Sequence, residues 1–567
     1  MPHVNIKKHL WLCLVLATIP LSCRTPYYTK GKETKSTYLT SIADKITGAA
    51  TPEQHKTQGI SYLKKGMLDE ALDELKLASE RIPKDAELLH YLGKAYYENG
   101  KTEEAITSLL NALSYYKPDQ TAEKADIYNT LGLAYKTKKA FSEALTSFKE
   151  SLELNPSVAE TNYNMGLLYY DKKLPDESIA YFKKAIKLDP NTSDAFFMLG
   201  LIYYNKNLFE KATVELKKAI TLNPQDAEAH NYLGILYFEQ GNIDKSIEEH
   251  QSAIQYDKNY TEALNNLGIA FYTKGSINEA KNAFENALKL EPNFAEAHYN
   301  LGLIYSKEED TENAVASLEQ AIKLNPRIGE AHFILGEVYT EKGMLSKALT
   351  EYEEAIDIKP NYEEAYYSYG ELYAAKGRHD KSISAWKKTI ELNPQNTNAL
   401  FNLGVAYYNQ GKLDTAIAMW NKAAEINPND YDTLTNLADA YIDNKSPDKA
   451  IHIWEKIVEM YPDRAEIYFK LGNEYAKKNM HNTSVPFWEK AVELDPNLIN
   501  AYYNLGLIYQ RNGELDKAID VYNKILDSGA EDIELHKILG SIYKEKGMHV
   551  EADSEFAIYQ KLKSISH

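Results

Sequence analysis

Apolar and small residues recur in a fixed pattern along most of the chain, and residues 295–328 show this pattern clearly. In the first half of this stretch, helical i, i+3, i+4, i+7 spacing places four residues on one face, namely His298, Leu301, Gly302 and Tyr305. The second half has four residues on one helical face in the same way, namely Ala314, Leu318, Ala321 and Ile322. Pro326 follows, and proline cannot continue a helix. The stretch therefore predicts two amphipathic helices that pack on each other.

The same pattern returns every 34 residues. We use the glycine at the position of Gly302 as the reference position of each unit and call it the anchor; Gly268 and Gly336 are the anchors of the units on either side. If each unit begins seven residues before its anchor, fifteen units begin at Pro52, Ala86, Ala125, Ala159, Ser193, Ala227, Thr261, Ala295, Gly329, Glu363, Thr397, Tyr431, Ala465, Ile499 and Ile533. A fixed period of this size is typical of a solenoid, because one helical hairpin cannot bury its apolar faces alone.

This unit resembles the tetratricopeptide repeat (TPR), which has a Leu-Gly pair, a Tyr three residues later, and then Ala, Phe or Tyr, Ala and Pro. The resemblance extends from Pro52 to the end of the chain, and Ala438 at one anchor is a departure from it. It implies an all-α solenoid, a right-handed superhelix of about fifteen helix-turn-helix repeats. A five-residue insertion at 120–124 separates repeats 1 and 2 (52–119) from repeats 3 to 15 (125–566). The insertion is expected either to lengthen a helix or loop and bend the array, or to be a tolerated surface addition.

The N-terminus differs from the repeats. Two lysines precede an apolar run at residues 10–21, which is too short to span a membrane and is typical of a signal peptide over residues 1–22. The sequence Pro20-Leu21-Ser22-Cys23 resembles a bacterial lipobox, which implies a diacylated (palmitate-type) Cys23 in the bacterial cell envelope. Ordinary cleavage, an uncleaved anchor and no export are the alternatives. Residues 23–51 are rich in Thr, Ser, Lys and Gly and read as a flexible tether.

Composition and motifs narrow the class of function. The net charge of −18 argues against nucleic-acid binding, which requires a basic surface. No phosphate-binding loop, dinucleotide-binding motif, metalloprotease motif or nucleophile elbow is present, so we expect no enzyme, no cofactor and no metal. Four histidines stand four residues before an anchor, at a packing position of the family, and are interpreted as packing residues rather than metal ligands: His230, His298, His332 and His536.

In a TPR the first helix of each unit lines the concave surface. The inner positions lie three residues before the anchor and one, four and five residues after it. In repeats 3 to 8 these positions are apolar and aromatic, and they predict an exposed peptide-binding band that includes Leu167, Tyr170, Leu201, Tyr204, Ile235, Phe238, Ile269, Tyr272 and Leu303. The alternative is that these side chains pack between repeats.

Asparagine recurs two residues before the anchor, at Asn164, Asn266, Asn300, Asn402, Asn436 and Asn504. Asparagine is a middling helix former, so propensity does not explain this recurrence. Its amide offers a donor and an acceptor that match a peptide backbone, and the row resembles the asparagine ladder of some TPR proteins. The alternative is bonding to neighbouring helices.

Repeats 9 to 13 differ in composition. Their inner positions include Glu337, Glu341, Glu371, Asp439, Asp443 and Asn473, which are interpreted either as a surface for a basic ligand or as ordinary acidic faces. Trp386, Trp420, Trp454 and Trp488 stand at a core position of the second helix.

The sequence as a whole predicts a lipid-anchored, non-enzymatic scaffold at the bacterial envelope that binds partner proteins or extended peptides. The alternatives are a substrate-recognition or adaptor subunit of a separate envelope enzyme or secretion complex, and a purely structural spacer.

Overall fold

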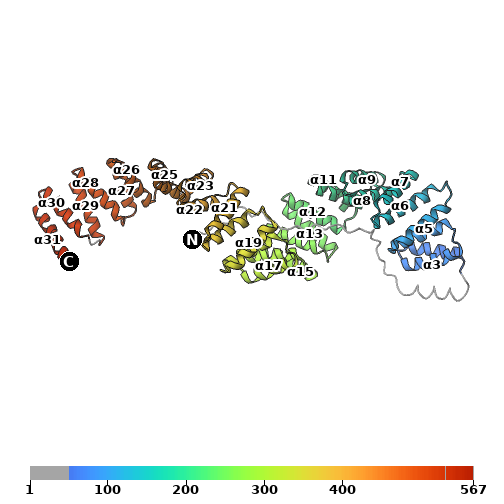
Figure 1. Ribbon diagram of the computed structural model, residues 1–567. Coiled ribbons are helices and arrows are strands. Elements are labelled where there is room, and N and C mark those ends of the chain that lie inside the picture. Colours follow the sequence, from blue (N-terminus) through green and yellow to red (C-terminus); the bar gives the residue numbers. More distant parts are fainter. Residues whose placement is uncertain (1–49, 530–531, 566–567) are drawn as a thin grey trace. The chain divides into compact units, whose positions relative to one another are not determined.

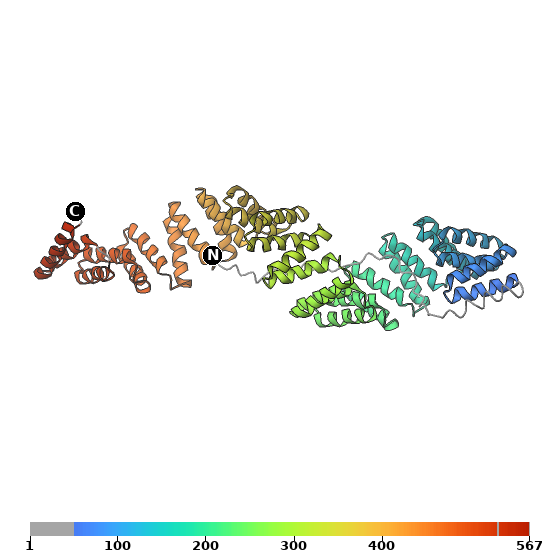
Figure 2. The ribbon, with the colours of Figure 1, turned by 90° about the horizontal axis from the view of Figure 1, so that it is seen from below.

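The computed structural model describes residues 50–529 and 532–565, and within these ranges the chain is helical with no strand. Thirty helices follow one another as fifteen antiparallel pairs, which confirms the predicted α-solenoid and its count of repeats (Figures 1 and 2). The signal peptide, Cys23 and most of the tether fall outside the described residues. Among the helices that are described, none combines the length and the apolar character needed to cross a bilayer.

The chain divides into two compact units, the first ending at Asn325 and the second beginning at Pro326. The first unit contains α2 (Pro52–Lys64), α3 (Leu68–Arg81), α4 (Ala86–Glu98), α5 (Thr102–Tyr115), α6 (Thr121–Thr137), α7 (Phe141–Leu154), α8 (Ala159–Asp171), α9 (Pro175–Leu188), α10 (Ser193–Asn205), α11 (Phe209–Leu222), α12 (Ala227–Glu239), α13 (Ile243–Tyr256), α14 (Thr261–Lys274), α15 (Ile277–Leu290), α16 (Ala295–Lys307) and α17 (Thr311–Leu324).

The second unit contains α18 (Gly329–Glu341), α19 (Leu345–Ile358), α20 (Glu363–Ala375), α21 (His379–Leu392), α22 (Thr397–Asn409), α23 (Leu413–Ile426), α24 (Tyr431–Asp443), α25 (Pro447–Met460), α26 (Ala465–Lys477), α27 (His481–Leu494), α28 (Ile499–Arg511), α29 (Leu515–Asp527), α30 (Ile533–Glu545) and α31 (His549–Ile565). Even-numbered helices are the first helices of their repeats, and odd-numbered helices are the second.

The insertion after residue 119 adds to a helix. Helix α6 begins at Thr121, four residues before the predicted start of its repeat at Ala125, and is 17 residues long. The other first helices of the first unit are 13 or 14 residues long. The extra residues therefore extend the first helix of repeat 3 by about one turn at its N-terminus.

The anchor glycines hold the two helices of each hairpin close together. A Cβ atom added to Gly302 would lie 2.6 Å from Cγ of Leu318, and one added to Gly404 would lie 2.3 Å from Nε1 of Trp420. Real Cβ atoms do not approach other atoms this closely, so only glycine permits this packing without a shift.

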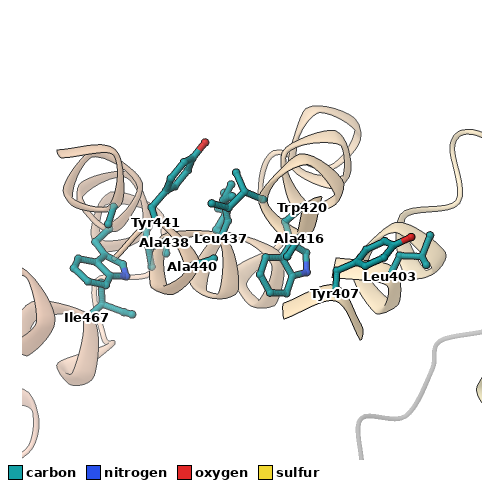
Figure 3. Packing of buried hydrophobic residues seen from close by; sticks show 14 of the residues in the cluster. Leu403, Tyr407, Ala416, Trp420, Leu437, Ala438, Ala440, Tyr441 and Ile467 are labelled. Carbon is teal, nitrogen blue, oxygen red and sulfur yellow. The ribbon is translucent and has the colours of Figure 1, made fainter. Parts of the chain in front are cut away.

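The four periodic tryptophans fill the core of the second unit, as predicted. Their exposed fractions are 5% for Trp386, 1% for Trp420, 2% for Trp454 and 2% for Trp488. Figure 3 shows Trp420 and Ala416 of α23 among buried side chains of neighbouring helices, including Leu403 and Leu437.

Many of the 44 tyrosines have a structural role that the sequence did not reveal. In several repeats the tyrosine three residues after the anchor lies beneath the ammonium group of a lysine eight residues further along, on the second helix of the same repeat. The Nζ atom lies 4.9 Å from the ring centroid in Lys347–Tyr339, 4.6 Å in Lys381–Tyr373 and 5.1 Å in Lys517–Tyr509. These cation–π contacts add to the packing within each hairpin.

Candidate protein-interaction site

The aliphatic side chains one residue after each anchor are buried in repeats 5 to 8. The exposed fraction is 2% for Leu201, 0% for Ile235, 0% for Ile269 and 3% for Leu303. The prediction that these four residues lie exposed on an inner surface is therefore wrong. Leu167, at the same position in repeat 4, is half-buried.

The physical reason is visible on α10 and α12, whose side chains interlock. Leu201 and Ile235 belong to one apolar cluster with Phe197 and Tyr232. The rings of Phe197 and Tyr232 meet edge to face, with centroids 5.8 Å apart. Such pairs bury large apolar areas and stabilise the contact between consecutive first helices. The aliphatic residues consequently belong to the packing between repeats.

The aromatic residues four after each anchor are less buried and form what we call the aromatic row. It consists of Tyr170, Tyr204, Phe238 and Tyr272, one each on α8, α10, α12 and α14, and all four are half-buried. Burial raises the pKa values of the Tyr170 and Tyr204 hydroxyls, because it disfavours the charged phenolate. These side chains therefore remain neutral hydrogen-bonding and apolar contact groups at ordinary pH.

Three of the predicted asparagines join neighbouring repeats. The Nδ2 atom donates to Oδ1 of another asparagine in the preceding repeat, 35 residues earlier: Asn164 to Asn129 (2.9 Å), Asn266 to Asn231 (3.2 Å) and Asn300 to Asn265 (2.9 Å). The donors are 1–5% exposed. The expectation that these amides border an open surface is wrong, and the alternative of bonding between neighbouring helices is correct for them.

The remaining asparagines behave differently from one another. Nδ2 of Asn402 lies 3.4 Å from the hydroxyl of Tyr367, which is a long contact, and the Asn402 side chain is half-buried. Nδ2 of Asn436 donates to the carbonyl of Asp432 in its own helix at 2.7 Å. Nδ2 of Asn504 donates to Oδ1 of Asn473 at 3.0 Å. For the pairs across 35 residues the sequence contained a signal, because their acceptors Asn129, Asn231 and Asn265 stand three residues before an anchor.

Neighbouring side chains bind several of the inner acidic residues in the second unit. Both carboxylate oxygens of Asp439 accept hydrogen bonds from Lys470 at 2.9 Å. The hydroxyl of Tyr367 donates to Glu371 at 2.8 Å, and that of Tyr408 donates to Asp443. These contacts favour the interpretation of ordinary acidic faces for repeats 10 and 12.

Glu337 lies in a different electrostatic environment from these residues. Its carboxyl is largely desolvated, and the neighbouring carboxylates Glu341 and Glu364 add like charge. Burial first, and then these two charges, raise the pKa of Glu337 to about 7. Within the described residues, no group of three or more His, Cys, Asp and Glu side chains is arranged to hold a metal ion.

Two of the four histidines that stand four residues before an anchor are buried within the packing of their repeats, as the sequence predicts, and His298 and His536 are half-buried. The buried two also form polar contacts. His230 and His332 are 8% and 6% exposed. Each contacts a glutamate of the second helix in the same repeat, Glu249 and Glu351 respectively. A search for His and Glu 19 residues apart would have found these pairs in the sequence.

The fold and its repeating contacts define a solenoid of helical hairpins. Models of a family described as TPR repeat match residues 200–241, 235–275, 270–308, 336–377, 370–411 and 472–513. Models described as Tetratricopeptide repeat match residues 84–157, 159–192, 295–328, 397–430, 419–452 and 499–528. The chain belongs to the tetratricopeptide repeat family. Four matches begin at predicted starts of repeats, namely Ala159, Ala295, Thr397 and Ile499.

Several solved structures resemble parts of the chain. PilF of Pseudomonas aeruginosa is 19% identical, with a TM-score of 0.34, over 36% of this chain and 94% of that one. MamA is 31% identical, with a TM-score of 0.28, over 29% of this chain and 97% of that one. YrrB, described as a TPR protein with an unusual peptide-binding site, is 28% identical, with a TM-score of 0.29, over 33% of this chain and 95% of that one. The comparison with curated proteins gave no match.

Proposed function

We propose that this protein is a non-enzymatic scaffold, anchored in the bacterial envelope through a lipid on Cys23, that binds an extended segment of a partner protein along the aromatic row. Membership of the TPR family supports a role in protein interaction. The observation that carries the proposal is the row itself, which places one half-buried aromatic side chain on each of four successive first helices.

The geometry of the row fits a chain segment rather than a compact surface. Helices α10, α12 and α14 contact one another in order, so their aromatic residues succeed one another at the spacing of the repeats. An extended peptide presents apolar side chains at regular intervals and can place them against successive rings. Aromatic side chains are enriched at such contacts because they bury large areas with little loss of rotamer freedom.

A photo-crosslinking amino acid placed at Tyr204 or at Phe238 is expected to join the protein to a partner in cells. The matched control places the same amino acid at Tyr256 or at Leu222, on second helices, where the native side chains are 42% and 38% exposed. The crosslinked peptide is identified by mass spectrometry, synthesised, and titrated against the purified full chain. Tyr204→Ala with Phe238→Ala is expected to weaken its binding at least about tenfold. Crosslinks from the control positions alone, or unchanged affinity of the double variant, would contradict the proposal.

The lipid anchor makes a separate prediction. Wild-type protein expressed in a bacterium with lipoprotein processing is expected to enter the detergent phase in phase partitioning, and Cys23→Ala is expected to remain in the aqueous phase. A diacylated cysteine gives two buried chains, each CH₂ contributing about 0.8 kcal/mol, which is enough for stable attachment. Cys13→Ala, which changes the other cysteine, is the matched control and should partition like wild type. Equal membrane attachment of all three proteins would show that Cys23 is not the anchor.

A further inference from the structure

His230 contacts two groups that can only accept hydrogen bonds. Its Nδ1 atom lies 2.7 Å from Oε2 of Glu249, on the second helix of the same repeat. Its Nε2 atom lies 3.0 Å from the carbonyl oxygen of Pro224, in the turn that precedes α12. A carbonyl has no proton to donate, and a carboxylate has none when it is ionised.

His332 repeats this arrangement in the second unit. Its Nδ1 atom lies 2.7 Å from Oε2 of Glu351, and its Nε2 atom lies 3.2 Å from the carbonyl oxygen of Pro326. Both histidines are nine-tenths buried or more, so water does not readily replace either contact. The same two partners at the same two atoms make this a repeated structural element.

A neutral imidazole has one N–H group and cannot donate from both nitrogens, whereas an imidazolium can. The geometry points to His230 and His332 as protonated residues that donate two hydrogen bonds each. These bonds link the turn before the first helix of the repeat to its second helix, and one of them is lost when the histidine loses its proton. The protein would thereby have two pH-sensitive links between a turn and a helix. Both hydrogen bonds of each link form in mildly acidic medium, and one is lost in alkaline medium.

The charged groups around each histidine agree with this assignment. Burial alone lowers the pKa of His230, but the hydrogen bonds to Glu249 and Pro224 and the charges of Glu249 and Asp226 outweigh it, and the pKa is raised. The ring also stacks on Tyr256, with centroids 5.6 Å apart.

For His332, burial again opposes the charge. The hydrogen bond and charge of Glu351, the Pro326 carbonyl and the charge of Glu354 together raise its pKa. The folded state therefore holds both protons more tightly than an unfolded chain.

The chain contains its own matched control at His298. This residue occupies the same position in repeat 8, and its Nε2 atom lies 3.0 Å from the carbonyl oxygen of Pro292. The residue at the place of Glu249 and Glu351 is Ser317, which has no carboxylate. One N–H group is enough for this single carbonyl contact, whereas His230 and His332 each contact both a glutamate and a carbonyl and need two.

The test is two-bond ¹H–¹⁵N correlation spectroscopy of the full chain labelled at histidine, from about pH 6 to about pH 9. His230 and His332 are expected to show two protonated nitrogens at about pH 6 and to convert to a neutral tautomer as the pH rises above neutrality. In Glu249→Gln and Glu351→Gln, the amide can donate to Nδ1 of a neutral imidazole, so conversion is expected at a lower pH. A non-protonated nitrogen on both histidines in wild type at about pH 6 would overturn the proposal.

Hydrogen exchange, corrected for the intrinsic effect of pH on the exchange rate, measures how strongly these hydrogen bonds stabilise the two segments, independently of the protonation state seen by spectroscopy. Protection of residues 224–239 and 326–341 is expected to fall roughly tenfold between about pH 6 and about pH 9 in wild type. Residues 292–307, which contain His298, should show no such step, and the two glutamine variants should lose the step only in their own segment. An equal change in all three segments would contradict local stabilisation by the hydrogen bonds of His230 and His332.

Discussion

Replacing Leu201 and Ile235 together with glutamate is expected to unfold the repeats that contain them. Both residues are almost fully buried, and they share a cluster with Phe197 and Tyr232. A carboxylate without a cationic partner in such a place loses its hydration and disrupts close packing. The cost is about 3 kcal/mol or more for each site. Circular dichroism should show a clear loss of helix, and hydrogen exchange should show lost protection in α10 to α13.

The matched control places the same two charges on the same two helices, at Tyr204 and Phe238. These positions are half-buried, so a glutamate there can keep much of its hydration. Tyr204→Glu with Phe238→Glu is expected to retain most of its helical signal while losing the crosslinked partner. Similar melting of both double variants would show that the four positions do not differ in burial.

His250→Phe is expected to prevent a loss of folding stability that the repeats around His250 undergo in acid. His250 occupies the position that faces the anchor glycine, where three other repeats of the first unit have Phe148, Phe182 and Phe284. It is 1% exposed, and its Nδ1 atom has no hydrogen-bond partner. Complete burial lowers the pKa of His250 to about 3, because the charged form cannot be solvated there.

A lowered pKa in the folded state contributes stability above the ordinary histidine pKa of about 6.5, and this contribution is lost as the pH falls toward the folded value. At about pH 4 the difference amounts to about 3 kcal/mol. Repeat arrays unfold in segments, so the measurement is hydrogen exchange of α12 to α14 at about pH 4 and about pH 7. Wild type should lose protection there in acid, and His250→Phe should retain it.

Phe284→His, which makes the reverse exchange one repeat later, is the control and should create the same acid sensitivity in α14 to α16. His230 and His332 act in the opposite direction, because their pKa values are raised. Their contribution is present below about pH 6.5 and is lost as the pH rises through the folded values. If wild type and His250→Phe lose protection equally in acid, burial of His250 is not the cause.

The period of the sequence was sufficient to predict the helices and the core. Gly302 faces Leu318 within one hairpin, and Gly404 faces Trp420 within another. Hairpin geometry of this kind depends on local sequence. Burial of Leu201 was not predictable in the same way. It depends on how α10 packs against α12, where the rings of Phe197 and Tyr232 meet edge to face.

The polar contacts between repeats could likewise not be predicted from the helical period alone. The recurrence of Asn266 and Asn300 was evident in the sequence, but their partners Asn231 and Asn265 are not on the same helix. An amide that can bond either a neighbouring helix or a bound peptide has the same sequence signal in both cases. The contacts of His230 and His332 likewise join two helices and a turn, which no single helical period describes.

The asparagine pairs have a consequence for how such a gene can change in length. Asn300 bonds Asn265, and Asn266 bonds Asn231, in each case across 35 residues. Asn300 now stands 35 residues after Asn265. If residues 261–294, one complete period, were lost, Asn300 would stand at this same separation after Asn231. A duplication of one period would likewise supply both members of a new pair. Recombination between segments that carry these asparagines can therefore shorten or lengthen the protein while their junctions keep the hydrogen bond, whereas insertions of other lengths break the pairing.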